Sequence, residues 1–219
     1  MHRILLLFAI LPLFAALILR KLNADRALSV ARKTHLHLKP EALARRMLDS
    51  MGLQDVELKT KKRVWAGASI LGDGWLCLPP PKADEPEHEM SAHAHGQAAL
   101  RVGLYLLSQR DPAAISRRQW ALRFGQVMPI FTTIVVVFGL AVAKIPVFWG
   151  LSIIVASLGL ATCAQVFTVV AGRQAASMAC LILEKKRTLP RLSEEEAVVA
   201  STRAWAWYGI VPGLLSRLM

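Results

Sequence analysis

Two long apolar stretches separated by only three residues constrain the fold of this chain more than any other feature. The first covers residues 124–143, the second covers residues 147–171, and Lys144, Ile145 and Pro146 lie between them. Each stretch is long enough to cross the roughly 30 Å hydrocarbon core of a bilayer as a helix. Because the connection is so short, the two helices must run antiparallel. Hydrophobic residues make up 54% of the chain, so the sequence predicts an α-helical membrane protein with a transmembrane hairpin.

A third apolar stretch predicts an N-terminal transmembrane anchor over residues 1–19. Residues 4–19 carry no charge, and Arg3 and Arg20 at the two ends can extend their guanidinium groups to the membrane surfaces. A cleaved signal peptide is the alternative, but no small-residue cleavage motif follows the stretch. We therefore expect the anchor to remain part of the protein.

The basic residues predict the orientation of the chain. Of the 27 Lys and Arg residues, 18 lie in residues 20–123 and seven follow residue 171, whereas Arg3 and Lys144 are the two that remain. Loops rich in Lys and Arg stay on the cytoplasmic side of a membrane. We expect the N-terminus outside and residues 20–123 and 172–219 in the cytoplasm.

The net charge of +12 fits cytoplasmic flanks that face anionic lipid, so the lipid bilayer is an expected partner. Nucleic acid is not, because no basic-aromatic motif of a known binding module is present. The three cysteines, Cys77, Cys163 and Cys180, show no CxxC spacing. This arrangement argues against a structural zinc site built from cysteine.

Residues 20–123 predict a small α+β domain. A helix is expected over residues 40–51, with Pro40 in its first turn and Gly52 ending it. A strand over residues 55–58 should follow, and then a β-hairpin over residues 64–78 that turns at Gly72, Asp73 and Gly74. Residues 91–109 predict the second helix of the domain.

Residues 172–219 predict a cytoplasmic helix and an interfacial C-terminal segment. Residues 173–186 should continue the apolar helix of residues 147–171 into the cytoplasm. A separate helix should begin with Ser193 as its cap, because acidic residues fill the turn that follows. Trp205 and Trp207, close to Arg203, indicate contact with the membrane interface.

The helix over residues 91–109 carries the most informative motif of the chain, Ser91-Ala92-His93-Ala94-His95-Gly96-Gln97-Ala98. A zinc protease of the zincin type has H-E-x-x-H on one helix face, where two histidines bind zinc and the Glu is the general base. In this chain His93 matches the first ligand. Ala94 stands in the place of the base, and Gln97 in the place of the second histidine.

The order of anchor, small α+β domain, histidine helix, hairpin and polar helix resembles the bacterial membrane-anchored neutral zinc metallopeptidases, the YugP-like group. Residues 44–56 are similar to that family's early helix-and-strand segment. The family's active helix, A-x-H-E-x-G-H-A, is matched at His93, Gly96 and Ala98. Its third zinc ligand is a Glu after the hairpin, in a P-V-E-x-D-A-S pattern, and Gly172 stands in that place within residues 170–176.

The resemblance implies a zincin-like fold with an N-terminal anchor and a location in the bacterial inner membrane. It does not imply the activity, because His93 alone remains of three ligands and one base. We therefore expect a catalytically inactive homologue that acts as a binding or scaffold subunit of a membrane assembly, with a membrane-protein partner. No catalytic residue and no cofactor is expected, and the vestigial positions are His93, Ala94, Gln97 and Gly172.

Two alternatives remain open. The first is an active zinc-dependent membrane peptidase that uses His88, His93 and His95 as unorthodox ligands. Because His93 and His95 lie about 200° apart around a helix, this site would need His88 to fold back from the preceding loop. The second is a membrane structural protein unrelated to peptidases.

Overall fold

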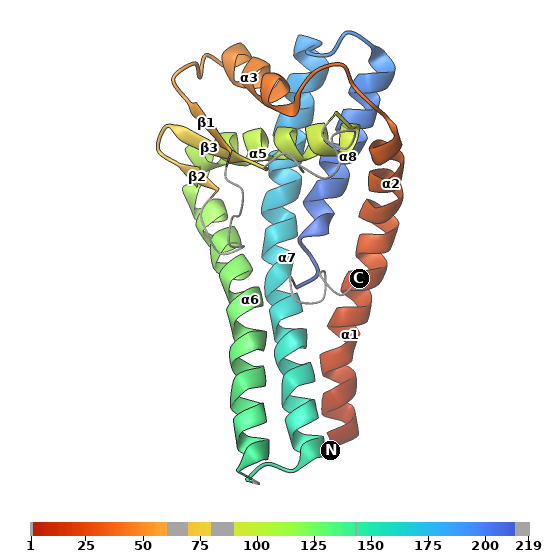
Figure 1. The fold of residues 1–219 in the computed structure, drawn as a ribbon, viewed down its shortest axis with the longest axis vertical. Helices are drawn as coiled ribbons and strands as arrows, with labels where there is room; N and C mark the ends of the chain where they lie inside the picture. The colour runs from red at the N-terminus through yellow and green to blue at the C-terminus, as the bar shows by residue number, and fades with distance from the viewer. Residues whose placement is uncertain (1, 61–69, 80–89, 143, 213–219) are drawn as a thin grey trace.

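The computed structural model describes residues 2–60, 70–79, 90–142 and 144–212, with side chains described from residue 9 on. Helices α1 (His2–Arg20), α6 (Pro112–Ala141) and α7 (Val147–Lys186) run along the long axis, and α5 (Ala92–Arg110) lies across them near one end (Figure 1). The other helices and a small sheet gather around α5. We call this end the head; it comprises the described parts of residues 26–110, residues 172–186 and helix α8 (Leu192–Tyr208).

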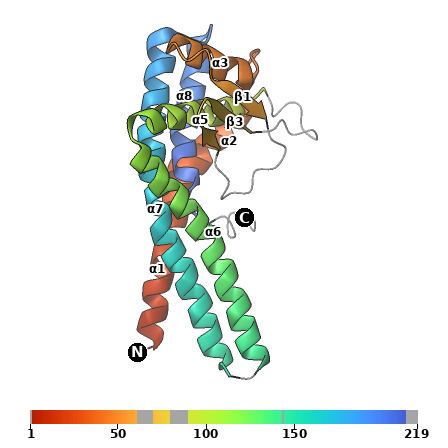
Figure 2. The same ribbon diagram turned by 90° about the vertical axis from the view of Figure 1, so that its left-hand side faces the viewer.

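Helices α6 and α7 form the predicted helical hairpin. They contain 30 and 40 residues, and among the described residues both are long and apolar enough to cross a membrane. Large apolar side chains are exposed on their outer faces, including Phe131, Ile134 and Phe138 of α6 and Phe148 and Leu160 of α7. This part projects away from the head (Figure 2). The predicted continuation of the apolar helix of residues 147–171 to residue 186 is confirmed, because α7 is one unbroken helix.

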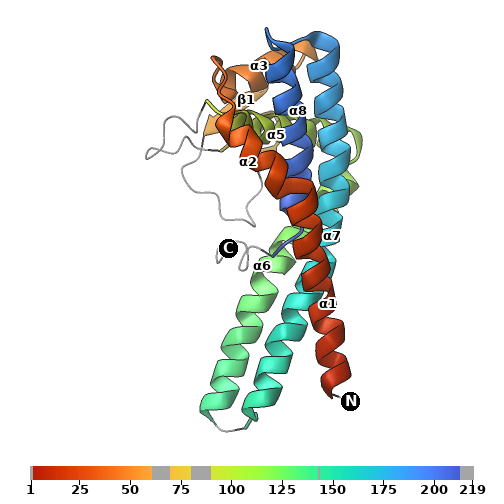
Figure 3. The ribbon, with the colours of Figure 1, turned by 90° about the vertical axis from the view of Figure 1, so that its right-hand side faces the viewer.

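Helix α1 packs along α7 (Figure 3). The two backbones come close at Gly159, where an added Cβ would lie 2.5 Å from the carbonyl oxygen of Ala9. The chain then passes through a π-helical turn (η1, Lys21–Asp25) into α2 (Arg26–Lys33). At this junction Arg20 is buried, pairs with Asp25 at 3.3 Å and lies 4.4 Å over the ring of Tyr208. These contacts fix α1 to the head, whereas a membrane-spanning role for residues 1–19 stays a prediction.

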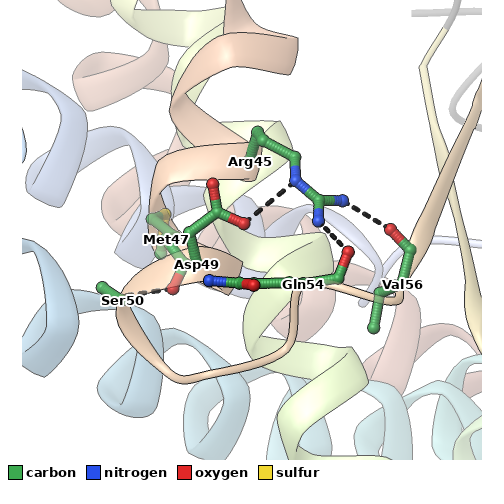
Figure 4. A network of polar contacts seen from close by, with 6 residues as sticks. All are labelled: Arg45, Met47, Asp49, Ser50, Gln54 and Val56. Atoms are coloured by element: carbon green, nitrogen blue, oxygen red, sulfur yellow. Dashed lines mark hydrogen bonds and ion pairs between the residues drawn. The ribbon is translucent and has the colours of Figure 1, made fainter.

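Helix α3 (Pro40–Ser50) follows the sequence prediction. Pro40 lies in its first turn, where a missing N–H leaves no helical hydrogen bond unmade. Gly52 follows the end of the helix with a φ of 74°, a conformation that glycine adopts without strain. The hydroxyl of Ser50 donates to the carbonyl of Met47 at 2.7 Å in the last turn (Figure 4).

The sheet has the strand order β1 (Glu57–Thr60), β3 (Trp75–Leu78), β2 (Leu71–Gly72). β1 and β3 are parallel, and β2 and β3 form the predicted antiparallel hairpin. The hairpin turns at Asp73 and Gly74, and Gly74 has a φ of 72°. Residues 64–69 of the predicted hairpin lie outside the described residues.

The strand predicted over residues 55–58 is displaced, because β1 begins only at Glu57. Arg45 of α3 supplies the physical reason. Its guanidinium donates to the carbonyl of Val56 at 2.6 Å and to the carbonyl of Gln54, and its Nε pairs with Asp49 at 3.0 Å (Figure 4). These bonds hold the chain in a turn against α3 as far as Val56, so pairing with β3 starts one residue later.

Helix α8 runs back along α7 (Figure 1). The predicted cap, Ser193, is wrong: the helix begins at Leu192, and Arg191 is the N-cap residue. The carbonyl of Arg191 accepts from the backbone N–H of Glu195 at 3.1 Å, which places Ser193 inside the helix. The predicted acidic first turn is present at Glu194 and Glu195, where the helix dipole favours negative charge.

The core of the head is assembled from segments on both sides of the hairpin. Its members include Leu43, Leu76, Leu104, Leu183 and Val198, from α3, β3, α5, α7 and α8. Gly103 allows α5 to cross α7 closely, since an added Cβ would lie 2.1 Å from the carbonyl oxygen of Ala175. Residues 20–123 and the residues after 171 therefore share one core, and α8 belongs to the head.

Candidate functional site

The motif noted in the sequence lies at the N-terminal end of α5. Ser91 is the N-cap residue, and its hydroxyl oxygen accepts from the backbone N–H of Ala94 at 3.4 Å. His93 and Gln97 are four residues apart on the helix, so they share one face, and both are half-buried. The structure thus keeps the helical frame on which a zincin would present its two histidines.

Trp205 of α8 packs directly on His93. The two rings lie 4.9 Å apart between centroids, and the indole Nε1 donates to the backbone carbonyl of His93 at 3.0 Å. Trp205 is half-buried, so part of its ring is engaged by α5, and the predicted contact with the membrane interface stays a prediction. An indole N–H away from water needs a hydrogen-bond acceptor, and the first turn of the motif helix supplies it.

Gly96 brings α5 and α8 into close contact one turn further along. A Cβ at this position would lie 2.3 Å from the hydroxyl oxygen of Ser201, which leaves no room for a side chain. Ser201 is fully buried, and its hydroxyl has no hydrogen-bond partner among the described residues. The glycine of the motif is thus explained by helix packing, with α8 lying against the motif face.

The remaining motif positions carry no acid–base group. Ala94 presents a methyl group where a zincin has its general base, so nothing at this position can accept a proton from a metal-bound water. Gln97 presents a neutral amide, which is not among the usual zinc ligands. His93 is therefore the one conventional zinc ligand among these three positions.

Gly172 of α7, the position matched to the third ligand, is buried against α8. The three atoms nearest to an added Cβ all belong to Ala206, beginning with its carbonyl oxygen at 3.1 Å. Ala206 follows Trp205 in the chain, so consecutive residues of α8 cover Gly172 and His93. Convergence of side chains at 93, 97 and 172 on one point stays a prediction.

His95 is directed away from any metal site in the motif. Its ring is fully buried, with Nδ1 2.8 Å from the carbonyl oxygen of Ser91 and Nε2 2.6 Å from that of Leu38. Burial lowers the pKa of His95 below its ordinary value, while the bonds to Ser91 and Leu38 and the charge of Glu194 oppose the shift. Because carbonyl groups face both ring nitrogens, neither presents a free lone pair to zinc. His95 instead ties α5 to the segment before α3.

The alternative site of three histidines is only partly covered by the described residues. His88 lies outside them, and His93 and His95 have the separate environments given above. Among the described residues, no group of three His, Cys, Asp or Glu side chains is arranged to hold a metal ion.

One buried cation near the motif was not anticipated from the sequence. Arg101 of α5 donates to the carbonyl of Cys77 at 2.6 Å and so fixes β3 on the helix. Burial lowers the pKa of Arg101 below its ordinary value. Cys77 itself is buried in β3, as its apolar neighbours predict.

Sequence reasoning missed Ser201 and the contact of Trp205 with His93. The spacing of four places Ser201 and Trp205 on one face of α8, and alanines follow the same face, which is a signal for helix packing. Comparison with protein-family descriptions, with curated proteins and with solved structures found no match to this chain.

Proposed function

We propose that the protein is an integral membrane protein whose head is a non-catalytic binding module and serves as a scaffold subunit of a membrane assembly. In this proposal the head keeps the helical frame of a zinc metallopeptidase and has lost its chemistry. The bilayer holds the hairpin and α1, and a membrane protein is the partner.

The observation that carries the proposal is the packing of α8 on the motif face of α5. Trp205 lies on His93, Ser201 fills the space beside Gly96, and Ala206 covers Gly172. A hydrolase needs an open cleft with room for a peptide and an attacking water. Coverage by α8 and the lack of a general base at Ala94 argue against turnover, while the half-buried Gln97 leaves part of the motif face accessible to a partner.

The membrane location is supported by the exposed apolar surface of the hairpin. Monomeric soluble proteins rarely leave large contiguous apolar patches exposed. The orientation proposed here, with the head in the cytoplasm, is supported by the basic residues around it. Alkaline carbonate extraction of the full-length protein tests the location: we expect it to stay in the membrane pellet, and release into the supernatant would contradict the proposal.

Orientation is tested with single cysteines in a Cys163→Ala background. Asp55→Cys lies in the head and Val147→Cys at the far end of the hairpin, and both positions are exposed. An impermeant maleimide applied to intact cells should label the cysteine at 147 and not the one at 55. The opposite pattern would invert the proposed topology.

Binding is tested with a photoreactive amino acid in place of Gln97, the half-buried motif residue. We expect a discrete adduct with one membrane protein in native membranes. The same photoreactive residue at Val30, an exposed position on α2, is the matched control and should not give this adduct. Equal adducts from both positions would show that the motif face has no binding role.

A further inference from the structure

A groove lies between α7 and α8 and has no lining residue from α5. It encloses about 480 Å³, and its floor is made of small side chains, among them Ser177 and Cys180 of α7. Its charged members are Arg173 and Glu184 of α7 and Arg203 of α8. The helix faces that meet α5, at Ala175 and Ser201, are not part of it. The groove is therefore separate from the motif on α5, and it shares with the candidate site Ala206, which covers Gly172.

Two arginines give the groove a positive charge that is only partly compensated. Arg203 pairs with Glu184 at 3.5 Å, and both side chains are largely exposed, so the pair is weak. Arg173 lies 5.6 Å over the ring of Trp207. Among the described residues no carboxylate lies within ion-pair distance of Arg173. An anion in the groove would therefore meet two arginines. The guanidinium of Arg173 lies over an aromatic ring, and Arg203 forms a weak ion pair with Glu184.

The groove continues an apolar stripe that descends along the hairpin. Val166, Val170, Arg173 and Ser177 follow one another at spacings of four, three and four residues, so they lie on one face of α7. Val166 and Val170 are exposed large apolar side chains. The face thus changes from apolar to cationic over one helical turn, about 5.4 Å. A phospholipid has the same order of groups, with acyl chains followed by a phosphate.

We infer that this groove binds the phosphodiester of an anionic phospholipid at Arg173, with the acyl chains along Val166 and Val170. Arg203, which pairs with Glu184 further along α7, adds positive charge at the other end of the groove. The inference rests on the proposed membrane location. Arg173 follows the apolar part of α7 by two residues, about 3 Å along the axis, which is the depth of the headgroup region. Trp207 contributes at the same level as an aromatic side chain of the interface. Guanidinium groups form strong charge-assisted hydrogen bonds with phosphate oxygens.

The test uses the full-length protein in a neutral detergent, titrated with phosphatidylglycerol or phosphatidylcholine and analysed by native mass spectrometry. Wild type should retain phosphatidylglycerol in preference to phosphatidylcholine. Arg173→Gln should weaken retention of phosphatidylglycerol by about tenfold, and Arg203→Gln should weaken it less. Lys186→Gln makes the same charge change on the same helix outside the groove, and should leave retention unchanged.

Three outcomes would overturn the inference: no preference for phosphatidylglycerol, equal losses in Arg173→Gln and Lys186→Gln, or complete displacement by inorganic phosphate. The last would show that the groove takes a soluble anion. Arg173→Lys keeps the charge and loses the planar guanidinium, and it serves as the control for misfolding. Its retention of phosphatidylglycerol should lie between those of wild type and Arg173→Gln. Carbonate extraction separates the two proposals: a protein that stays in the membrane without selective lipid binding refutes this inference alone, whereas release by carbonate refutes the membrane location itself.

Discussion

The two halves of α7 belong to one unbroken helix, and their side chains have different surroundings. In residues 147–171, large apolar side chains such as Phe148, Leu160 and Phe167 are exposed. In residues 172–186, small side chains such as Ala175 and Ala179 are fully buried against α5. Small residues let helix backbones approach closely, whereas soluble monomers rarely expose large contiguous apolar surfaces to water. Side-chain size therefore separates the head from the hairpin more sharply than hydropathy does.

The close helix crossing in the head should be the most sensitive point of the molecule. Gly103→Ala would place a Cβ 2.1 Å from the backbone oxygen of Ala175, which cannot move alone. We expect a loss of about 3 kcal/mol or more in the free energy of unfolding. The control is Gly139→Ala in the hairpin, where the Cβ would meet the flexible end of Ile145. Thermal unfolding in detergent should show a large difference, and equal effects would remove the distinction between the two regions.

Introducing a charge at an exposed apolar side chain should give the second largest difference between the hairpin and the head. Ile134 in the hairpin and Val30 in the head are 63% and 65% exposed, so burial alone predicts equal tolerance. We expect Ile134→Asp to lower membrane insertion by about 3 kcal/mol, because a carboxylate would enter hydrocarbon. Val30→Asp should change little. The fraction of protein that resists carbonate extraction measures both, and tolerance of Ile134→Asp would mean that water surrounds the hairpin.

A small substitution at the contact between α7 and α8 should lower the free energy of unfolding less than Gly103→Ala does. Gly172→Ala would place a Cβ 3.1 Å from the carbonyl oxygen of Ala206, so a shift of a few tenths of an ångström suffices. We expect a loss of about 1 kcal/mol in the free energy of unfolding. Gly172→Glu should cost much more, because it also buries a carboxylate. If unfolding measurements showed Gly172→Glu to be as stable as Gly172→Ala, α8 would not cover this position.

The smallest expected effect is a dependence of head stability on pH through His95. Burial lowers the pKa of His95 in the folded state, so the unfolded chain binds a proton more readily. The stabilisation is therefore present above the ordinary pKa of about 6.5 and is lost as the pH falls from there towards the folded pKa. Unfolding midpoints between about pH 7.5 and about pH 5.5 should fall less in His95→Gln than in wild type. His37→Gln, at an exposed histidine, should behave as wild type.

The periodic and apolar features of the sequence predicted most of the fold. The hairpin, α3 with Gly52 after it, and the turn at Gly74 all depend on local patterns that leave few alternatives. The start of β1 could not be predicted, because it depends on Arg45 reaching across to the carbonyls of Gln54 and Val56. That contact is tertiary and has no local signature.

The candidate site was harder to predict because its surroundings come from a distant segment. The motif itself indicated the missing base at Ala94, which needs no tertiary information. Placing Trp205 required knowing that α8 folds back onto α5. Trp205 lies 112 residues after His93 in the sequence. An aromatic residue near basic residues gives the same local pattern at a membrane interface and at a helix contact, so the pattern alone could not reveal the packing of Trp205 on His93.

The most direct test of a non-catalytic head is the zinc content of the full-length protein. The protein is purified without metal, dialysed against a small excess of zinc and analysed for bound metal. We expect far less than one zinc per chain, because Ala94 and Gln97 replace the groups that a zincin requires. His93→Ala should leave that value unchanged. One zinc per chain in wild type, lost in His93→Ala and retained in the exposed-histidine control His37→Ala, would contradict the proposal and indicate a working metal site.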